Sequence, residues 1–172
     1  MTLNLGYFQG IESSTTEWKT LSFDRGRGAI EVAVPVLSET QLKSLCTRVK
    51  NMSQTYLKTI PVSDLVNIID TTISSFLDRT NPYRQQAEDL LHRITGYDPE
   101  MIRLGLTSYL KTFRKVELNR FLSEDFSNPK ILDEFQPLPK GGLGRAYGPD
   151  LLFHIWAGNV PGLPIWSLVS GL

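Results

Sequence analysis

The sequence is poor in residues that cross-link a chain or bind metal ions. It contains one cysteine and two histidines among 172 residues. A single cysteine cannot form a disulfide within the chain, which excludes a disulfide-stapled secreted scaffold. The cysteine and the histidines also lack the spacing of metal ligands, so we expect no metal site.

The chain also lacks net charge, because 18 Lys and Arg residues balance 18 Asp and Glu residues. Proteins that bind nucleic-acid phosphates need a basic excess, so nucleic acid is not an expected partner. The first ten residues have neither the basic start nor the apolar centre of a signal peptide. We therefore expect a cytoplasmic protein.

The first of three parts, residues 1–37, has the alternating pattern of strands. Apolar and polar residues alternate over 17–23, and the turn at 25–28 leads into the apolar run 29–34. This pattern predicts a hairpin or a small sheet. Arginines beside the turn glycines also occur in RNA-binding segments, but a plain hairpin explains them better.

The second part, residues 38–137, carries the signals of helix ends. Ser38 and Gln41 form a capping box. Asn81 and Asp98 each precede a proline at the first helical position, and a further helix is expected to open at Ser63. Gly96 is placed to end the Asn81 helix, and shorter helices are expected at 114–125 and 128–135.

The apolar stripes of these helices predict which side chains face the core. The expected core residues of the Asn81 and Asp98 helices are Tyr83, Ala87, Leu90, Leu91, Ile94, Ile102, Leu106, Tyr109, Leu110 and Phe113. Cys46 lies at helical spacing with Leu42 and Val49. We interpret it as a small core residue rather than a nucleophile, because reactive thiols need exposure and positive surroundings. His92 lies off its stripe and is expected in solvent.

The third part, residues 138–172, differs because no charged residue follows Asp150 over the last 22 positions. Prolines and glycines inside this run argue against a membrane span. We expect instead a buried strand over 151–156 with His154 as an interior histidine, a turn over 157–162, and a helix from near Pro164. The glycines of 142–148 do not match a dinucleotide fingerprint, since they precede the strand, and predict a flexible entry into it.

The turn over 157–162 is the strongest candidate for a site. It follows the predicted buried strand, where α/β sheets bind their ligands. Ala157 and Gly158 are small and allow close approach to the backbone, while the amide of Asn159 is a neutral donor suited to an oxyanion. The alternative is that Asn159 only holds the turn through its own backbone.

The residues around this turn match a known pattern. Tyr147-Gly148-Pro149 is followed by the run from Leu152 to Pro164, and similar matches occur at 81–83, 95–97 and 101–106. Over about residues 60–172 the chain resembles the acyl-CoA reductase family, which includes the long-chain fatty acid reductase of bacterial luminescence. This family looks like a branch of the aldehyde dehydrogenase superfamily.

The resemblance implies an α/β, aldehyde dehydrogenase-like fold that is incomplete here. In that fold, N-terminal strands (1–37) and a helical region (38–137) precede the first strand, turn and helix of a nucleotide-binding domain (138–172). It implies that Asn159 is the oxyanion donor and that Trp156, Ala157 and Gly158 line NADPH. A strand such as 151–156 needs parallel neighbours from later sequence, so we expect the N-terminal part of a longer protein.

The resemblance also implies the reaction. A fatty acyl-CoA, or an acyl group delivered by a partner synthetase, is reduced to a fatty aldehyde by NADPH through a cysteine thioester. Cys46 does not match that cysteine, which is expected beyond Leu172, so this chain alone should be inactive. At full length the protein is expected to be a homo-oligomer.

Two other interpretations remain at this stage. One is another CoA-dependent or phosphate-dependent relative within the aldehyde dehydrogenase superfamily. The other is a non-catalytic helical interaction domain, complete at 172 residues, whose apolar end at 165–169 docks a partner. A peripheral membrane contact through that end is disfavoured, because the segment lacks a Lys/Arg face.

Overall fold

The computed structural model describes residues 2–4, 6, 11–24, 26, 28–156 and 163–171, and its described part is mixed α/β. The strands are β1 (Thr2–Asn4), β2 (Glu17–Phe23), β3 (Ile30–Val36), β4 (Gln136–Pro137) and β5 (Leu143–Gly144). The α-helices are α1 (Glu39–Thr55), α2 (Val62–Leu77), α3 (Pro82–Thr95), α4 (Pro99–Lys111), α5 (Lys115–Asp125) and α6 (Leu163–Ser170). Short 3-10 helices are η1 (Ser13–Thr15), η2 (Leu57–Thr59) and η3 (Pro129–Leu132). Within these described ranges, no helix has the length and apolar character needed to cross a membrane.

The N-terminal part forms a three-stranded sheet in the order β1-β3-β2. β2 pairs antiparallel with β3, from Glu17 opposite Val36 to Phe23 opposite Ile30, and β1 lies parallel to β3 on its other side. The predicted hairpin is therefore confirmed. Ile30 and Val32 of the central strand are buried, as expected for the strand that has a neighbour on each edge. Arg25 and Arg27 lie outside the described residues.

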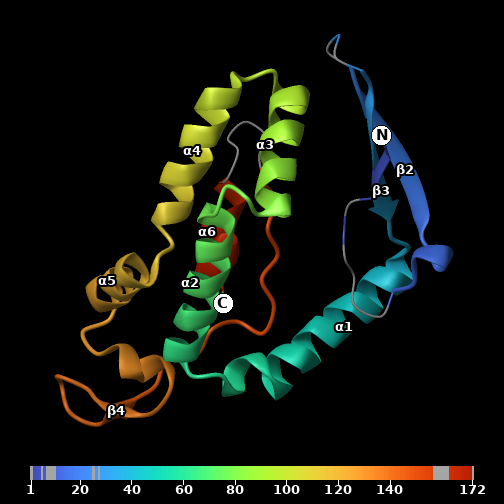
Figure 1. Cartoon of the computed structure of the whole chain (residues 1–172). Helices are drawn as coiled ribbons and strands as arrows, with labels where there is room; N and C mark the ends of the chain where they lie inside the picture. Colours follow the sequence, from blue (N-terminus) through green and yellow to red (C-terminus); the bar gives the residue numbers. More distant parts are fainter. Residues whose placement is uncertain are drawn as a thin grey trace.

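Helix α1 connects the sheet to the remaining helices (Figure 1). Its predicted capping box is confirmed, because the Gln41 N–H donates to Ser38 Oγ at 3.2 Å and the Ser38 N–H donates to Gln41 Oε1 at 2.9 Å. None of the residues of α1, all of which the structure describes, is buried. The interpretation of Cys46 as a core residue is therefore wrong, since its side chain is exposed. Helical spacing with apolar neighbours does not bury a residue when no other element packs on that face.

The caps of α3 and α4 form as the sequence predicts. The Asn81 side chain accepts hydrogen bonds from the backbone of Tyr83 and Arg84, and Asp98 does the same for Glu100 and Met101. α3 ends at Gly96, which has a φ of 77° and so adopts the left-handed conformation that glycine tolerates.

The start of α2 differs from the prediction. The helix begins at Val62, so Ser63 lies within its first turn and does not cap it. Instead, the Val62 N–H donates to Asp133 Oδ1 at 2.9 Å. A residue 71 positions away therefore supplies the capping oxygen, which a search for local cap motifs cannot find.

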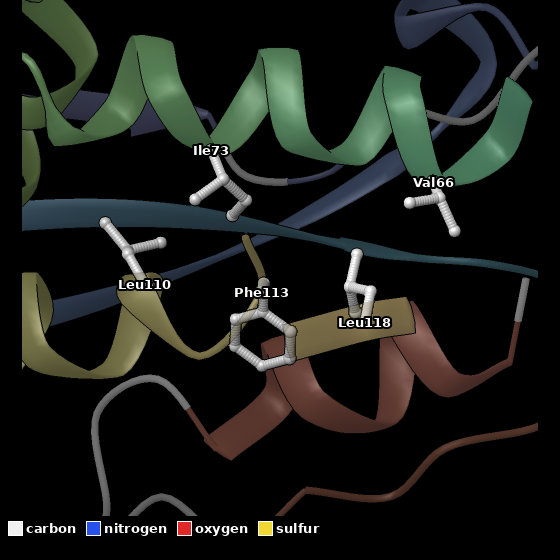
Figure 2. Close-up of a cluster of buried hydrophobic side chains, with 5 residues drawn as sticks. All are labelled: Val66, Ile73, Leu110, Phe113 and Leu118. Carbon is white, nitrogen blue, oxygen red and sulfur yellow. The ribbon is translucent and has the colours of Figure 1, made fainter. Parts of the chain in front are cut away.

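The main core lies between α2, α4 and α5. Its buried members are Val66, Ile73, Leu110, Phe113 and Leu118, whose side chains converge in Figure 2. Helix α6 covers this cluster with Ile165 and Val169, and the Trp166 ring lies 5.6 Å from Phe113. The expected burial of Leu110 and Phe113 is thus confirmed.

A buried arginine holds α2, α3 and α4 together. The expected core residue Tyr83 is 68% exposed, whereas the neighbouring Arg84 is 1% exposed. The Arg84 guanidinium donates to Glu88 Oε1 at 2.6 Å, Thr107 Oγ1 at 2.8 Å, and the carbonyl oxygens of Arg103 at 2.9 Å and Phe76 at 3.4 Å. The prediction for Tyr83 was wrong because the Arg84 guanidinium, with a hydrogen bond from each of its three nitrogens, occupies the inner face of α3 at this point.

A second polar joint links α2 to α5. Asp70 Oδ1 accepts hydrogen bonds from Arg114 Nε at 2.6 Å and from the Lys115 backbone N–H at 2.8 Å. The hydrogen bond from the Arg114 side chain, followed by that from the Lys115 backbone, lowers the pKa of Asp70. Asp70 therefore supplies the N-terminal cap of α5 across the helix–helix contact.

Candidate functional site

The predicted site residues are Trp156, Ala157, Gly158 and Asn159. The structure describes Trp156, whereas the other three lie outside the described residues. The stretch before them contains β5, which pairs with β4 as a short hairpin. In addition, the Ala146 N–H donates to the Ile131 carbonyl at 2.8 Å. The glycine-containing stretch 142–148 is thus partly structured, not simply a flexible entry.

Residues 151–156 do not form the predicted buried strand. Phe153 and Ile155 are 82% and 86% exposed, and no strand among the described residues pairs with the segment. An apolar strand of this kind is buried only when neighbouring strands and helices cover its edges and faces. The described part of the chain supplies a cover on one side only.

Helix α6 provides that cover. Trp156 Nε1 donates to Ser167 Oγ at 2.7 Å. A Cβ placed on Gly171 would lie 2.8 Å from Leu152 Cδ1 and 3.5 Å from His154 Nε2, so this end of the helix lies against the segment. Side chains at 152, 154 and 156 therefore face α6, while those at 153 and 155 point away, which is the two-residue period of extended chain.

His154 lies in this contact and not in a sheet interior. It is half-buried, and its ring stacks on that of Trp156 with centroids 5.8 Å apart and planes inclined by 16°. The prediction of His154 as an interior histidine of a buried strand was wrong because the strand itself does not form. The outcome is an aromatic pair whose outer member, Trp156, remains 48% exposed.

The indole N–H of Trp156 has its hydrogen-bond partner on α6. Ser167 Oγ accepts from the indole N–H and donates to the Pro164 carbonyl at 3.2 Å, so the single hydroxyl hydrogen and one lone pair are both used. The ring is therefore oriented by its own hydrogen bond, and the exposed part of its surface is free to contact a flat aromatic group.

At the start of the segment, Asp150 forms ion pairs and a hydrogen bond with α1 and η2. Asp150 Oδ1 accepts from Lys58 Nζ at 2.8 Å and from Gln54 Nε2 at 3.3 Å, and Asp150 Oδ2 lies 3.3 Å from Lys50 Nζ. Hydrogen bonds from Lys58, then Gln54 and Lys50, lower the pKa of Asp150 to about 2. Sequence reasoning missed this contact, although Asp150 stands out as the last charged residue before the uncharged run.

The predicted helix near Pro164 is confirmed as α6. Ile165 and Val169 pack on the core, and the Trp166 ring contacts Phe121 edge-on at 5.2 Å as well as Phe113. Three of the apolar side chains proposed above as a docking surface, Ile165, Trp166 and Val169, therefore already make contacts inside the chain.

The remaining candidate residues lie elsewhere. His92 is half-buried rather than solvated, because its Nδ1 lies 2.6 Å from the Tyr97 carbonyl at the end of α3. Cys46 is on α1, away from α6 in Figure 1. In the part of the chain that the structure describes, no group of three His, Cys, Asp or Glu side chains is arranged to hold a metal ion.

Comparison with known proteins identifies the family. The family model described as acyl-CoA reductase (LuxC) matches residues 57–172, a stretch that runs from η2 through α6. No curated protein matches the chain, and no solved structure matches it. Because the matched stretch makes up well over half of the sequence, the chain belongs to the acyl-CoA reductase (LuxC) family. The resemblance seen in the sequence is thereby confirmed, and the protein is of the reductase class.

Proposed function

We propose that this chain is the N-terminal part of an NADPH-dependent reductase that converts a long-chain fatty acyl-CoA to a fatty aldehyde. The observation that carries the proposal is the family match over residues 57–172, which includes α6, Trp156 and the candidate site residues 157–159. On this proposal, residues 138–172 begin a nucleotide-binding domain of the aldehyde dehydrogenase type. The enzyme works in the cytoplasm as a homo-oligomer.

The cofactor is proposed to lie against Trp156, Ala157 and Gly158. A nicotinamide cofactor supplies the hydride of the reaction. The exposed, oriented ring of Trp156 fits a role in lining a flat aromatic group, since its N–H is already bonded to Ser167 and needs no partner from the ligand. Ala157 and Gly158 are small residue types, which suits a close approach of the cofactor to the backbone.

The proposed role of Asn159 is to stabilise negative charge on the substrate oxygen. Its side-chain amide donates to the oxygen of the thioester as that oxygen gains charge. A preorganised donor of this kind contributes about 3–4 kcal/mol to the transition state in other acyl-transfer enzymes.

The proposed chemistry uses a cysteine that is not in this chain. Its thiolate attacks the acyl carbonyl and displaces the CoA thiolate, or receives the acyl group from a partner synthetase. Hydride transfer to the thioester carbon then expels the cysteine thiolate and releases the aldehyde. Cys46, the single cysteine present, lies on α1 before the stretch that the family model matches, which argues against this role.

The test is an assay of the protein purified from the cells that make it, followed by its intact mass. NADPH oxidation is measured with a long-chain acyl-CoA, with an acyl phosphate and with free aldehyde. We expect consumption with acyl-CoA, and none when the 172-residue chain is assayed alone. Failure of the natural protein to oxidise NADPH with acyl-CoA would contradict the proposal.

A labelled acyl group locates the nucleophile. After incubation with labelled acyl-CoA without NADPH, peptide mass spectrometry is expected to find the label on a cysteine outside residues 1–172. Label on Cys46 would show that the assignment of the nucleophile is wrong. The Cys46→Ser variant is the matched control and should keep full activity.

A further inference from the structure

The Trp156 ring is held by two contacts whose combined effect is to fix its plane. Its N–H donates to Ser167 Oγ at 2.7 Å, and one of its faces stacks on the His154 ring. An exposed tryptophan without such contacts would populate several rotamers, and a ligand would have to order it on binding.

Ser167 is itself attached to the packed core of the molecule. It lies on α6 next to Trp166, whose ring packs on Phe113 and Phe121. Because its hydroxyl also donates to the Pro164 carbonyl, the lone pair that accepts from Trp156 has a set direction. The position of the Trp156 ring is therefore coupled to the hydrophobic core through one hydroxyl group.

The main chain that carries Trp156 is fixed at its start as well. Asp150 is bonded to Lys58 of η2 and to Gln54 and Lys50 of α1. Gln54 and Lys50 precede residue 57, so part of this anchor comes from outside the stretch that the family model matches. Five residues, 151–155, thus lie between the ionic anchor at Asp150 and the side-chain hydrogen bond of Trp156. None of them has a strand partner among the described residues.

We propose that Ser167 is a positioning residue that orients the Trp156 ring for contact with the nicotinamide cofactor, with Asp150 anchoring the segment that carries the ring. This inference rests on the proposed function, in which Trp156 lines the cofactor. It predicts that loss of the hydroxyl weakens cofactor binding while leaving the chemistry of hydride transfer intact.

The catalytic arm of the test uses the natural protein with three substitutions on one helix. Ser167→Ala is expected to raise KM for NADPH by about three- to tenfold with kcat unchanged. This factor corresponds to the entropy cost of immobilising one side chain when the cofactor binds. Ser167→Thr keeps a hydroxyl and should restore KM. Ser170→Ala removes a hydroxyl that donates within α6 and should behave as wild type. A wild-type KM in Ser167→Ala would overturn the inference.

The second arm does not depend on activity. The indole N–H resonance of Trp156, identified in ¹H–¹⁵N spectra by its loss in Trp156→Phe, is expected to shift and to exchange faster with water in Ser167→Ala. Asp150→Asn should accelerate its exchange too, whereas Ser170→Ala should not. An unmoved resonance in Ser167→Ala would overturn the inference. A shifted resonance in a natural protein that does not oxidise NADPH would overturn the proposed function, and with it the cofactor role of Ser167, while leaving the contact intact.

Discussion

Replacement of Arg84 should destabilise the fold more than replacement of a surface arginine whose guanidinium also forms several hydrogen bonds. Its guanidinium is buried and donates to four acceptors on α2, α3 and α4. Removing one partner from a buried charged network costs about 3–5 kcal/mol. Since whole domains are stable by only about 5–15 kcal/mol, Arg84→Ala should remove a large part of the stability of this chain.

The acceptors left without Arg84 decide where in the range of about 3–5 kcal/mol the loss of stability falls. The Arg103 carbonyl keeps a hydrogen bond from Thr107 Oγ1 at 2.7 Å, so it is not left unpaired. The Glu88 side chain is 25% exposed and can turn towards water. The uncompensated losses are the Phe76 carbonyl, the packing of the arginine stem and the cavity that it leaves. We therefore expect about 3 kcal/mol, at the lower end of the range.

The measurement is urea unfolding of the 172-residue chain followed by far-UV circular dichroism. Arg120→Ala is the matched control, because Arg120 is also bonded through its guanidinium, to the carboxylates of Glu117 and Glu124, but is half-exposed. Its loss should leave the midpoint near wild type. Arg84→Lys separates charge from geometry, since one ammonium group cannot reach acceptors on three helices. This variant should unfold at nearly as low a urea concentration as Arg84→Ala. Equal midpoints for Arg84→Ala and Arg120→Ala, or a wild-type midpoint for Arg84→Lys, would refute the reasoning.

Two further predictions concern acid stability and glycine. The folded-state pKa of Asp150 is about 2, below the ordinary value of about 3.9, and that of Asp70 is also lowered. Their stabilisation is therefore fully present above the ordinary carboxyl pKa and is lost as pH falls through the folded-state values. In Asp150→Asn, the free energy of unfolding should therefore fall less steeply as the pH is lowered. An unchanged fall would contradict the stabilising role of the Asp150 carboxylate. Gly96→Ala should destabilise by about 1 kcal/mol because φ is positive there. Gly105→Ala, in open space within α4, should stabilise by about 0.5–1 kcal/mol, so thermal melts of the two should move in opposite directions.

Features that depend on neighbouring residues in the chain could be read from the sequence. The caps at Ser38, Asn81 and Asp98 and the glycine end at Gly96 form as predicted. A cap joins a side chain to backbone groups two or three residues away, so the local sequence contains both partners. The same holds for the β2–β3 hairpin, where alternation and a turn define the pairing.

Features that depend on distant partners were decided by the tertiary structure. Whether Tyr83 or Arg84 faces inward depends on acceptors supplied by α2 and α4, and whether Cys46 is buried depends on what packs against α1. The Asp133 cap of Val62 joins residues that the sequence cannot pair by spacing.

The candidate site divides in the same way. The sequence determined the family, through side chains contiguous around Trp156, and with it the class of chemistry. The orientation of that tryptophan was decided by the tertiary structure, which brings Ser167 to its N–H and three donors to Asp150. The physical reason is that residue types record which groups are available, whereas hydrogen-bond direction and burial arise only once packed helices bring separate segments together.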